Sequence, residues 1–328
     1  MNAALPRRAA LGAAAALSVA AAAGAARGQP AWPSRPVRVV VPFPPGGLAD
    51  SVARPLAARL ATVFGQPFVV DNRPGAGGNV GAEAVAKAEP DGHTLLVGSL
   101  GPLAVNAWLF PSLPFDPRAF APVSLLIQTP KVVVVNPARP WRDLEALTAA
   151  ARAAPGRLSA GSAGNGSSLH IALELYKQAA GVDVTHVPYR GAAAAVTDLV
   201  GGRLDLLIDN VPNILAQIRA GAVRPLAVAT EARLPQLPDV PTTAEAGLPA
   251  LRFGTWFGLV APPGTPAEVA RRLAEAVDAA LRDPEIGGRL AEQGAVPSGG
   301  TPEAFGRLME AEREKLEPVA RGSGMRAD

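Results

Sequence analysis

The sequence predicts an α/β protein with two lobes, each a mostly parallel sheet flanked by helices. From residue 37 onward, short runs rich in β-branched residues alternate with longer segments rich in alanine and leucine. Strands separated by helices are typical of parallel sheets that are covered on both faces. Hydrophobic residues make up 48% of the chain. A length of roughly 300 residues beyond the leader described next exceeds one ordinary domain, so we expect two lobes.

Residues 1–28 are predicted to be a signal peptide. Arg7 and Arg8 precede an alanine-rich apolar run, and small residues follow up to a cleavage site near Gly28. This order is typical of secretory leaders, and the run is shorter than the ~20 apolar residues that span a membrane. The paired arginines leave both the twin-arginine and the Sec export routes open. We therefore expect a periplasmic protein.

Charge and composition exclude several classes of function. The chain holds 31 Lys and Arg against 28 Asp and Glu, and the leader contains three of the arginines and no acidic residue. Without the leader the protein is close to neutral, which gives no support for nucleic-acid binding. The absence of cysteine excludes disulfides, thiol catalysis and a lipid-modified N-terminus. The three histidines lack the spacing of a metal site, so neither metal nor cofactor is expected.

The alternation of segments predicts the elements in order. Strands are expected at residues 37–41, 68–71, 94–98, 123–128, 131–136, 158–161, 184–188, 204–208, 226–229 and 257–260. Helices are expected at residues 50–62, 80–88, 144–153, 169–179, 192–200 and 214–220. Two more helices should follow Thr265 and Thr301, which precede prolines and have the character of N-caps.

The predicted lobes follow from these elements. Lobe one should comprise residues 29–127 and 228–328, and lobe two residues 128–227. Strands that cross between the lobes near Leu125, Val133 and Leu226 would then form the hinge.

The first predicted strand ends in the turn "VPFPPGGLAD", residues 41–50. It lacks the lysine of a phosphate-binding loop, and its adjacent glycines do not match the dinucleotide-binding spacing. What remains is a stiff turn into a helix, and the N–H groups of a helix N-terminus attract anions. A purely structural turn has the same composition, so this turn alone does not decide between the two.

Similar turns follow four further strands, in "DNRPGAGGNVG", "VGSLGPL", "GSAGNGSSLH" and "VPYRGAAAA". Ligands of open α/β sheets bind beyond the carboxyl ends of the strands, so these turns should face one another across a cleft. Their N–H and hydroxyl donors suit a carboxylate. The expected ligand-binding residues, which include Asp209 at the end of a later strand, are Phe43, Gly46, Gly47, Ala49, Asp50, Asn79, Ser99, Ser162, Asn165, Ser167, His170, Tyr189 and Asp209.

A periplasmic enzyme that acts on a carboxylate substrate is the alternative from another class. Ser167 and His170 are close enough in sequence to form a nucleophile–base pair, but no third member can be named and the G-x-S-x-G elbow is absent. His170 is otherwise expected to shape the pocket, whereas His93 and His186 are expected to be structural. Asp209 could meet an ammonium or hydroxyl group of a ligand.

Four segments resemble the Bug-type solute receptors of tripartite tricarboxylate transporters. They are "WPSRPVRVVVPFPPGGLADSVAR", "VVDNRPGAGGNVGAEAVAKAEPDGHTLL", "HVPYRGAAAAVTDLVGGRLD" and "LPDVPTTAEAGLP", and the resemblance runs from about Trp32 to Val319. It implies a two-lobed type II periplasmic-binding-protein fold without catalytic activity. It also implies a small organic carboxylate ligand (a dicarboxylate, tricarboxylate, amino acid or aromatic acid) held largely by the loops at residues 43–50 and 162–170.

The resemblance further implies membrane permease subunits as partners of a monomeric receptor. An orphan receptor that signals to a sensor protein remains open. The sequence departs from the family pattern at His93, where an aromatic residue is usual, and at Arg190, where lysine is common. Leu48 makes the cleft face of the first loop apolar, which favours a less polar ligand.

Overall fold

The computed structural model describes residues 32–322. The predicted signal peptide lies outside the described residues. Residues 1–34 form one unit, of which residues 32–34 are described, and the chain from Arg35 onward forms a second compact unit that contains all elements discussed below. None of the helices in residues 32–322 combines the length and the apolar character needed to cross a membrane.

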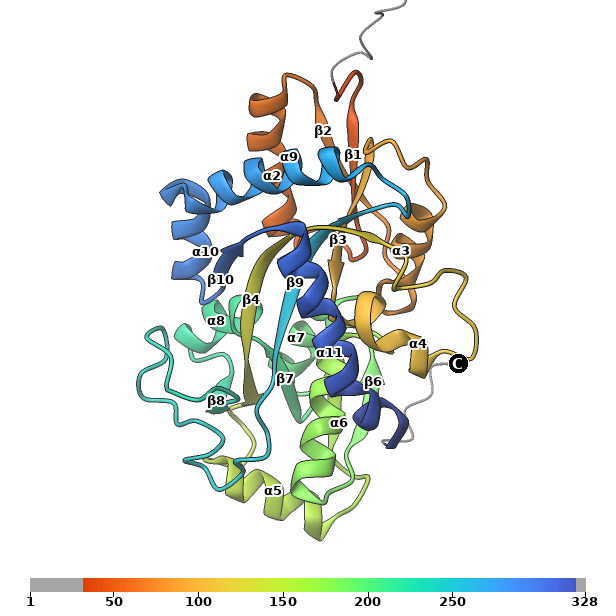
Figure 1. The fold of residues 1–328 in the computed structure, drawn as a ribbon. Coiled ribbons are helices and arrows are strands. Elements are labelled where there is room, and N and C mark those ends of the chain that lie inside the picture. Colours follow the sequence, from red (N-terminus) through yellow and green to blue (C-terminus); the bar gives the residue numbers. More distant parts are fainter. Residues whose placement is uncertain (1–31, 323–328) are drawn as a thin grey trace, which may run out of the picture. The chain divides into compact units, whose positions relative to one another are not determined.

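One half of the second unit is built on strands from both ends of the sequence (Figure 1). In this half, β1 pairs in parallel with β2 and β3, whereas β9 pairs antiparallel with β3 and β4. The short strand β10 adds to the edge of β4. The strands are β1 (Val37–Val41), β2 (Phe68–Asn72), β3 (Thr94–Ser99), β4 (Ala121–Val135), β9 (Gly254–Ala261) and β10 (Val296–Gly299).

The other half shares β4, whose second part pairs antiparallel with β7 and β8. From β7 the sheet continues in parallel through β5 to β6. The predicted parallel pairing therefore holds for the outer strands, whereas pairs that involve β4 or β9 are antiparallel. The remaining strands are β5 (Ser159–Ser162), β6 (Thr185–Pro188), β7 (Leu206–Asn210) and β8 (Arg224–Val228).

Helices cover both halves, which confirms the α/β class. They are α2 (Leu48–Phe64), α3 (Asn79–Ala86), α4 (Asn106–Leu109), α5 (Leu144–Ala153), α6 (Ser168–Ala180), α7 (Ala192–Val200), α8 (Val211–Arg219), α9 (Ala267–Arg282), α10 (Arg289–Glu292) and α11 (Pro302–Gly322). Short 3₁₀ or π turns lie at Ala76–Gly78, Gly101–Val105 and Pro284–Gly288.

The long strand β4 is the main departure from the predicted elements. Two strands were expected, at residues 123–128 and 131–136, but one strand of 15 residues runs through both. Proline cannot donate a ladder hydrogen bond and would interrupt most strands. Pro130 does not interrupt β4, because it lies where the pairing of β4 changes from β9 to β7. The strand β10 was not expected, since its sequence VPSG carries little strand signal. The predicted lobe boundaries remain a prediction.

The two N-cap predictions have different outcomes. Thr301 does cap α11, because its Oγ1 accepts a hydrogen bond from Ala304 N. The prediction for Thr265 is wrong: its hydroxyl donates to the carbonyl oxygen of Pro262, and Pro266 occupies the N-cap of α9 without a side-chain cap. The preceding turn offers Thr265 an acceptor, which competes with the role of a cap.

Candidate ligand-binding site

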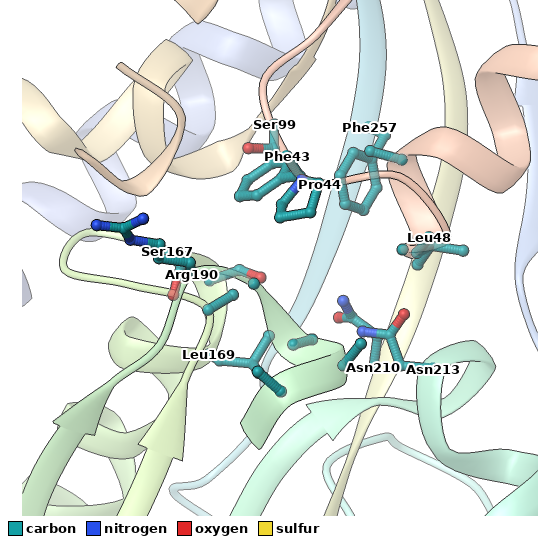
Figure 2. Close-up of a pocket in the computed structure, with 18 of the residues that line it drawn as sticks. Phe43, Pro44, Leu48, Ser99, Ser167, Leu169, Arg190, Asn210, Asn213 and Phe257 are labelled. Atoms are coloured by element: carbon teal, nitrogen blue, oxygen red, sulfur yellow. The ribbon is translucent and has the colours of Figure 1, made fainter. Parts of the chain in front are cut away.

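A cavity of about 210 Å³ lies between the strand ends of the two halves (Figure 2). From the β1–β3–β9 side it is lined by Phe43, Pro44, Pro45, Gly47, Leu48, Ala49, Ser99 and Phe257. From the β5–β7 side it is lined by Ala163, Ser167, Ser168, Leu169, Arg190, Gly191, Ala192, Ala193, Ala194, Asn210 and Asn213. Two neighbouring cavities, of about 510 and 520 Å³, share lining residues with it and extend it into a cleft.

Four helices begin at this cavity. The N-caps of α2, α6, α7 and α8 are Gly47, Ser167, Gly191 and Asn210, and all four line it. In α2, α7 and α8 no side chain bonds to the first-turn N–H groups. Each helix N-terminus carries unsatisfied donors and the positive end of the helix dipole. Their convergence makes the cavity a site of positive potential without a metal ion.

The side chains around the cavity are mostly apolar and include no carboxylate. Phe43, Leu48, Leu169 and Phe257 form opposing walls in Figure 2. Arg190 is exposed, and its guanidinium extends away from the end of the cavity that holds Asn210. The described residues contain no cluster of three or more potential metal ligands. The cavity can therefore hold an organic anion that has an apolar body.

The loop after β1 is held from behind by Asp50. This buried carboxylate accepts hydrogen bonds from Gly46 N (3.0 Å), Arg54 Nε (2.8 Å) and Asn72 Nδ2 (2.9 Å). Burial alone raises the pKa of Asp50, but these hydrogen bonds outweigh it and leave the pKa below its usual value. Asp50 does not line the cavity. Its hydrogen bonds hold the loop after β1 in place, and other residues of that loop line the cavity.

The substitution Asp50→Asn is expected to destabilise the protein by roughly 2–3 kcal/mol, because one acceptor oxygen becomes an amide NH₂ that faces a hydrogen-bond donor, and the charge that pairs with Arg54 is lost. Urea unfolding at pH 7 measures this loss. The control is Glu83→Gln, which removes a surface pair with Lys87 and should cost less than about 0.5 kcal/mol. Equal unfolding midpoints for the two variants would contradict the role given to Asp50.

The loop between β5 and α6 is fixed by two stacked histidines. The rings of His170 and His186 lie 3.9 Å apart at an angle of 6°. His170 Nδ1 accepts a hydrogen bond from Gly166 N, and His186 Nε2 lies 2.6 Å from Ser162 Oγ. Ser167 Oγ accepts from His170 N as the N-cap of α6. The histidines and Ser162 thus support the loop from below, and the Ser167 hydroxyl bonds to the backbone of residue 170 rather than to its ring.

At the end of β7, Asp209 orients two residues of the cavity. Its Oδ1 accepts from Asn210 N (2.6 Å) and from Asn213 Nδ2 (2.8 Å), and its side chain is fully buried. Asn210 Oδ1 in turn accepts from Thr129 Oγ1. Burial raises the pKa of Asp209 despite the opposing field of Lys131.

The structure brings some of the predicted residues together and separates others. Five of them line the cavity: Phe43, Gly47, Ala49, Ser99 and Ser167. Gly46 lines one neighbouring cavity, whereas Asn165 and Tyr189 line the other. The remaining residues lie behind the surface: Asp50, Asn79, Ser162, His170 and Asp209. Asn79 accepts from Asn106 Nδ2 at 2.7 Å and is the first residue of α3.

Several cavity residues were not predicted. Asn210 and Asn213 follow Asp209 in the sequence, and the rule that ligands bind beyond strand ends could have found them. Pro44 and Arg190 belong to turns that were recognised, and Leu48, which was expected on the cleft face of the first loop, does line the cavity. Phe257 could not have been found this way, because it lies inside β9 and reaches the cavity through a pairing with β3.

Loops of the two halves touch beside the cavity. A Cβ atom built at residue 101 would lie closer than 3.0 Å to the carbonyl oxygen of Gly166, and one built at residue 77 would collide in the same way with that of Asn165. Gly77 has φ = 62°, whereas Gly101 has no positive φ. Glycine is therefore needed at residue 101 for close approach and not for backbone conformation.

Known proteins resemble this chain over most of its length. A protein of Pseudomonas sp. (strain P51), described as a UPF0065 protein in the tcbD-tcbE intergenic region, is 45% identical over 291 residues, which cover 88% of this chain and 86% of that protein. Protein BugT of Bordetella pertussis is 39% identical over 295 residues, which cover 89% of this chain and 90% of its own length.

Solved structures of other proteins are also similar to this chain, both in sequence and in fold. A structure of an R. palustris protein with adipate is 41% identical with a TM-score of 0.85 and covers 89% of this chain and 98% of its own. A structure of MatC from Rhodopseudomonas palustris with bound malate is 38% identical with a TM-score of 0.85. The match covers 88% of this chain and 100% of the MatC chain. The two-lobed fold is thereby confirmed.

The family follows from these matches. The model described as "Tripartite tricarboxylate transporter family receptor" matches residues 52–325. This is a family of solute receptors and not of enzymes, so the catalytic alternative is set aside. The chain belongs to the tripartite tricarboxylate transporter receptors, and the resemblance to Bug-type proteins seen in its motifs is confirmed.

Proposed function

We propose that the protein is a periplasmic receptor that captures a small organic carboxylate in the 210 Å³ cavity and presents it to a membrane permease. The convergence of four helix N-termini on a cavity without carboxylates is the observation that supports this most strongly. Adipate and malate, named with two similar structures, are both carboxylates. The apolar walls suit the carbon skeleton of such an acid.

The expected affinity agrees with such a role. Hydrogen bonds to a charged group each contribute about 1.5–3 kcal/mol. A micromolar complex needs roughly 8 kcal/mol in total. A few bonds from the first-turn N–H groups and from Ser99 would therefore be enough, without a salt bridge to a side chain that lines the cavity.

The first test is a thermal-shift screen of the chain from residue 29 onward. Adipate, malate, succinate and benzoate are each compared with the corresponding amide. A ligand at a hundred times its dissociation constant stabilises the native state by about 2.7 kcal/mol. We expect at least one acid to raise the melting temperature while its amide does not, because the amide lacks the charge that the helix N-termini attract.

Two results would contradict this function. Equal shifts for an acid and its amide would mean that charge plays no part in recognition. No shift for any acid would mean that none of these four carboxylates is bound, and the proposed function would lose its support. Isothermal titration of the best acid then gives the dissociation constant that the next experiments need.

Export, monomeric state, lobe boundaries and the permease partner are parts of the same proposal. Residues 1–28 would direct export and be removed, and the parts of β4 near Leu125 and Val133 would act as the hinge together with Leu226. Binding would favour the arrangement in which the loops at Gly101 and Gly166 touch, because ligand contacts to both halves lower its free energy. The permease would then recognise this arrangement.

A further inference from the structure

A lysine lies buried directly behind the cavity. Lys131 on β4 has no exposed surface, and its Nζ donates to Ser168 Oγ at 3.0 Å. Ser168 lines the cavity as the first residue of α6. We propose that Lys131 supplies the positive charge that balances the bound carboxylate, acting through the hydroxyl of Ser168. This inference rests on the proposed function, and it makes Lys131 a positioning residue rather than a ligand contact.

The strand register places Lys131 next to a second cavity residue. Lys131 lies opposite Asn210 in the antiparallel pair of β4 and β7. Directly opposite residues of such a pair point to the same face of the sheet, and Asn210 lines the cavity. Lys131 is therefore flanked by Ser168 and Asn210, both of which the ligand would reach.

The ammonium group of Lys131 forms no salt bridge within the described residues. In the described part of the chain no acidic oxygen lies within 4.0 Å of its Nζ. Asp209 is next to Asn210 on β7 and therefore points to the other face of the sheet, where it bonds to Asn213. A buried charge without a salt-bridge partner is costly, and a carboxylate in the cavity would offset part of that cost.

Other titratable groups on the surrounding elements are engaged elsewhere. On α6, Glu174 bonds to Lys177 and lies 3.9 Å from His170 Nε2. The ring centroid of Phe253 is 6.0 Å from Lys131 Nζ. The neighbouring residue Arg252 pairs with Glu231 at the surface. Asp209 is the charged group whose field is felt at Lys131.

Ser168 can link Lys131 to the ligand through a chain of hydrogen bonds. An ammonium group only donates hydrogen bonds, so Ser168 Oγ is the acceptor and its own hydrogen is left for another partner. Ser168 lines the cavity, so a carboxylate oxygen that reaches its hydroxyl would accept that hydrogen. A chain of hydrogen bonds polarised in this way is stronger than isolated bonds.

The arrangement predicts that binding takes up a proton. Burial lowers the pKa of Lys131 to about 7, although the field of Asp209 opposes the shift. A bound carboxylate adds a second negative charge and raises that pKa again. Affinity is then highest where Lys131 is already protonated, below pH 7, and falls as the pH rises. From the lowered pKa, the dissociation constant is expected to rise about tenfold between pH 6 and pH 8.

The test is titration calorimetry with the tightest acid of the four-acid panel, at pH 6, 7 and 8, on the wild type and on Lys131→Met. The wild type should show the tenfold change, and its apparent enthalpy should vary with the ionisation enthalpy of the buffer. Lys131→Met should bind about tenfold more weakly at pH 6 and show no change up to pH 8. The control Lys315→Met, at the surface beside Glu312, should behave as the wild type.

The outcomes separate this inference from the proposed function. If the wild type binds the acid with a constant affinity from pH 6 to pH 8, Lys131 does not act in this way, while the receptor function stands. The same holds if Lys131→Met keeps the pH dependence. If no acid of the panel binds, the proposed function fails with it. The buffer dependence of the wild type decides the matter even if Lys131→Met does not fold.

Discussion

Substitution of Gly101 by alanine is expected to weaken ligand binding about tenfold to a hundredfold. The new Cβ would overlap the carbonyl oxygen of Gly166, which belongs to the other half of the protein. Overpacking of this kind costs roughly 1–3 kcal/mol, and each 1.4 kcal/mol is a factor of about ten in affinity. The cost falls on the arrangement in which the two loops touch, so the ligand must overcome it. Titration calorimetry at 25 °C measures the loss.

Gly101 is the cleanest position for this test. At Gly77 a methyl group would also collide across the cleft, with Asn165, but its φ of 62° would strain any alanine there. Gly288→Ala serves as the matched control, because its nearest neighbour, Pro284 Cβ, is at an ordinary 3.9 Å. We expect Gly288→Ala to bind as the wild type does. Unchanged affinity in Gly101→Ala would mean that contact between these loops is not required for binding.

Acid is expected to destabilise the protein through His170. Burial, and after it the charges of His186 and Lys177, lowers the pKa of His170 to about 3, compared with about 6.5 in an unfolded chain. Between these two values the unfolded state binds the additional proton, so stability falls as the pH falls from 6.5 towards 3. Each unit corresponds to about 1.4 kcal/mol. At pH 4.5 this histidine alone should cost about 2–3 kcal/mol.

The variant His170→Asn isolates this effect. Asparagine can place its Oδ1 where Nδ1 accepts the hydrogen bond from Gly166 N, but it does not titrate. Urea unfolding at pH 8 and pH 4.5 should show that the wild type loses about 2–3 kcal/mol more than the variant. Equal stability of the two proteins at pH 8 is the control. If both lose the same amount, His170 does not control acid unfolding.

Much of the site could be predicted because its turns are local in sequence. Phe43, Gly47, Ala49, Ser99 and Ser167 all line the cavity, and each lies between the last residue of a strand and the first turn of the next helix. In a parallel sheet the strand ends meet at one edge, so a turn recognised by its composition is also placed in space. The same reasoning identified Asp50 and Ser162, which fix these turns from behind the surface.

Other features depended on pairings between distant segments. Phe257 reaches the cavity because β9 pairs with β3, although the two strands are far apart in the sequence. Lys131 appeared as an ordinary strand residue, and its burial results from packing against α6 and β7. Gly101 had no special spacing in the sequence, and its need for glycine arises from the approach of Gly166.

The sequence by itself determined the α/β class, the family and the turns that surround the ligand, because strand, turn and helix signals are carried by neighbouring residues. Tertiary structure alone decided that β4 joins the two halves, that a buried lysine lies behind Ser168, and that Gly101 and Gly166 touch. These features arise where separate segments meet. Burial, close approach and the interaction of charges depend on distances in space, which spacing along the chain does not encode.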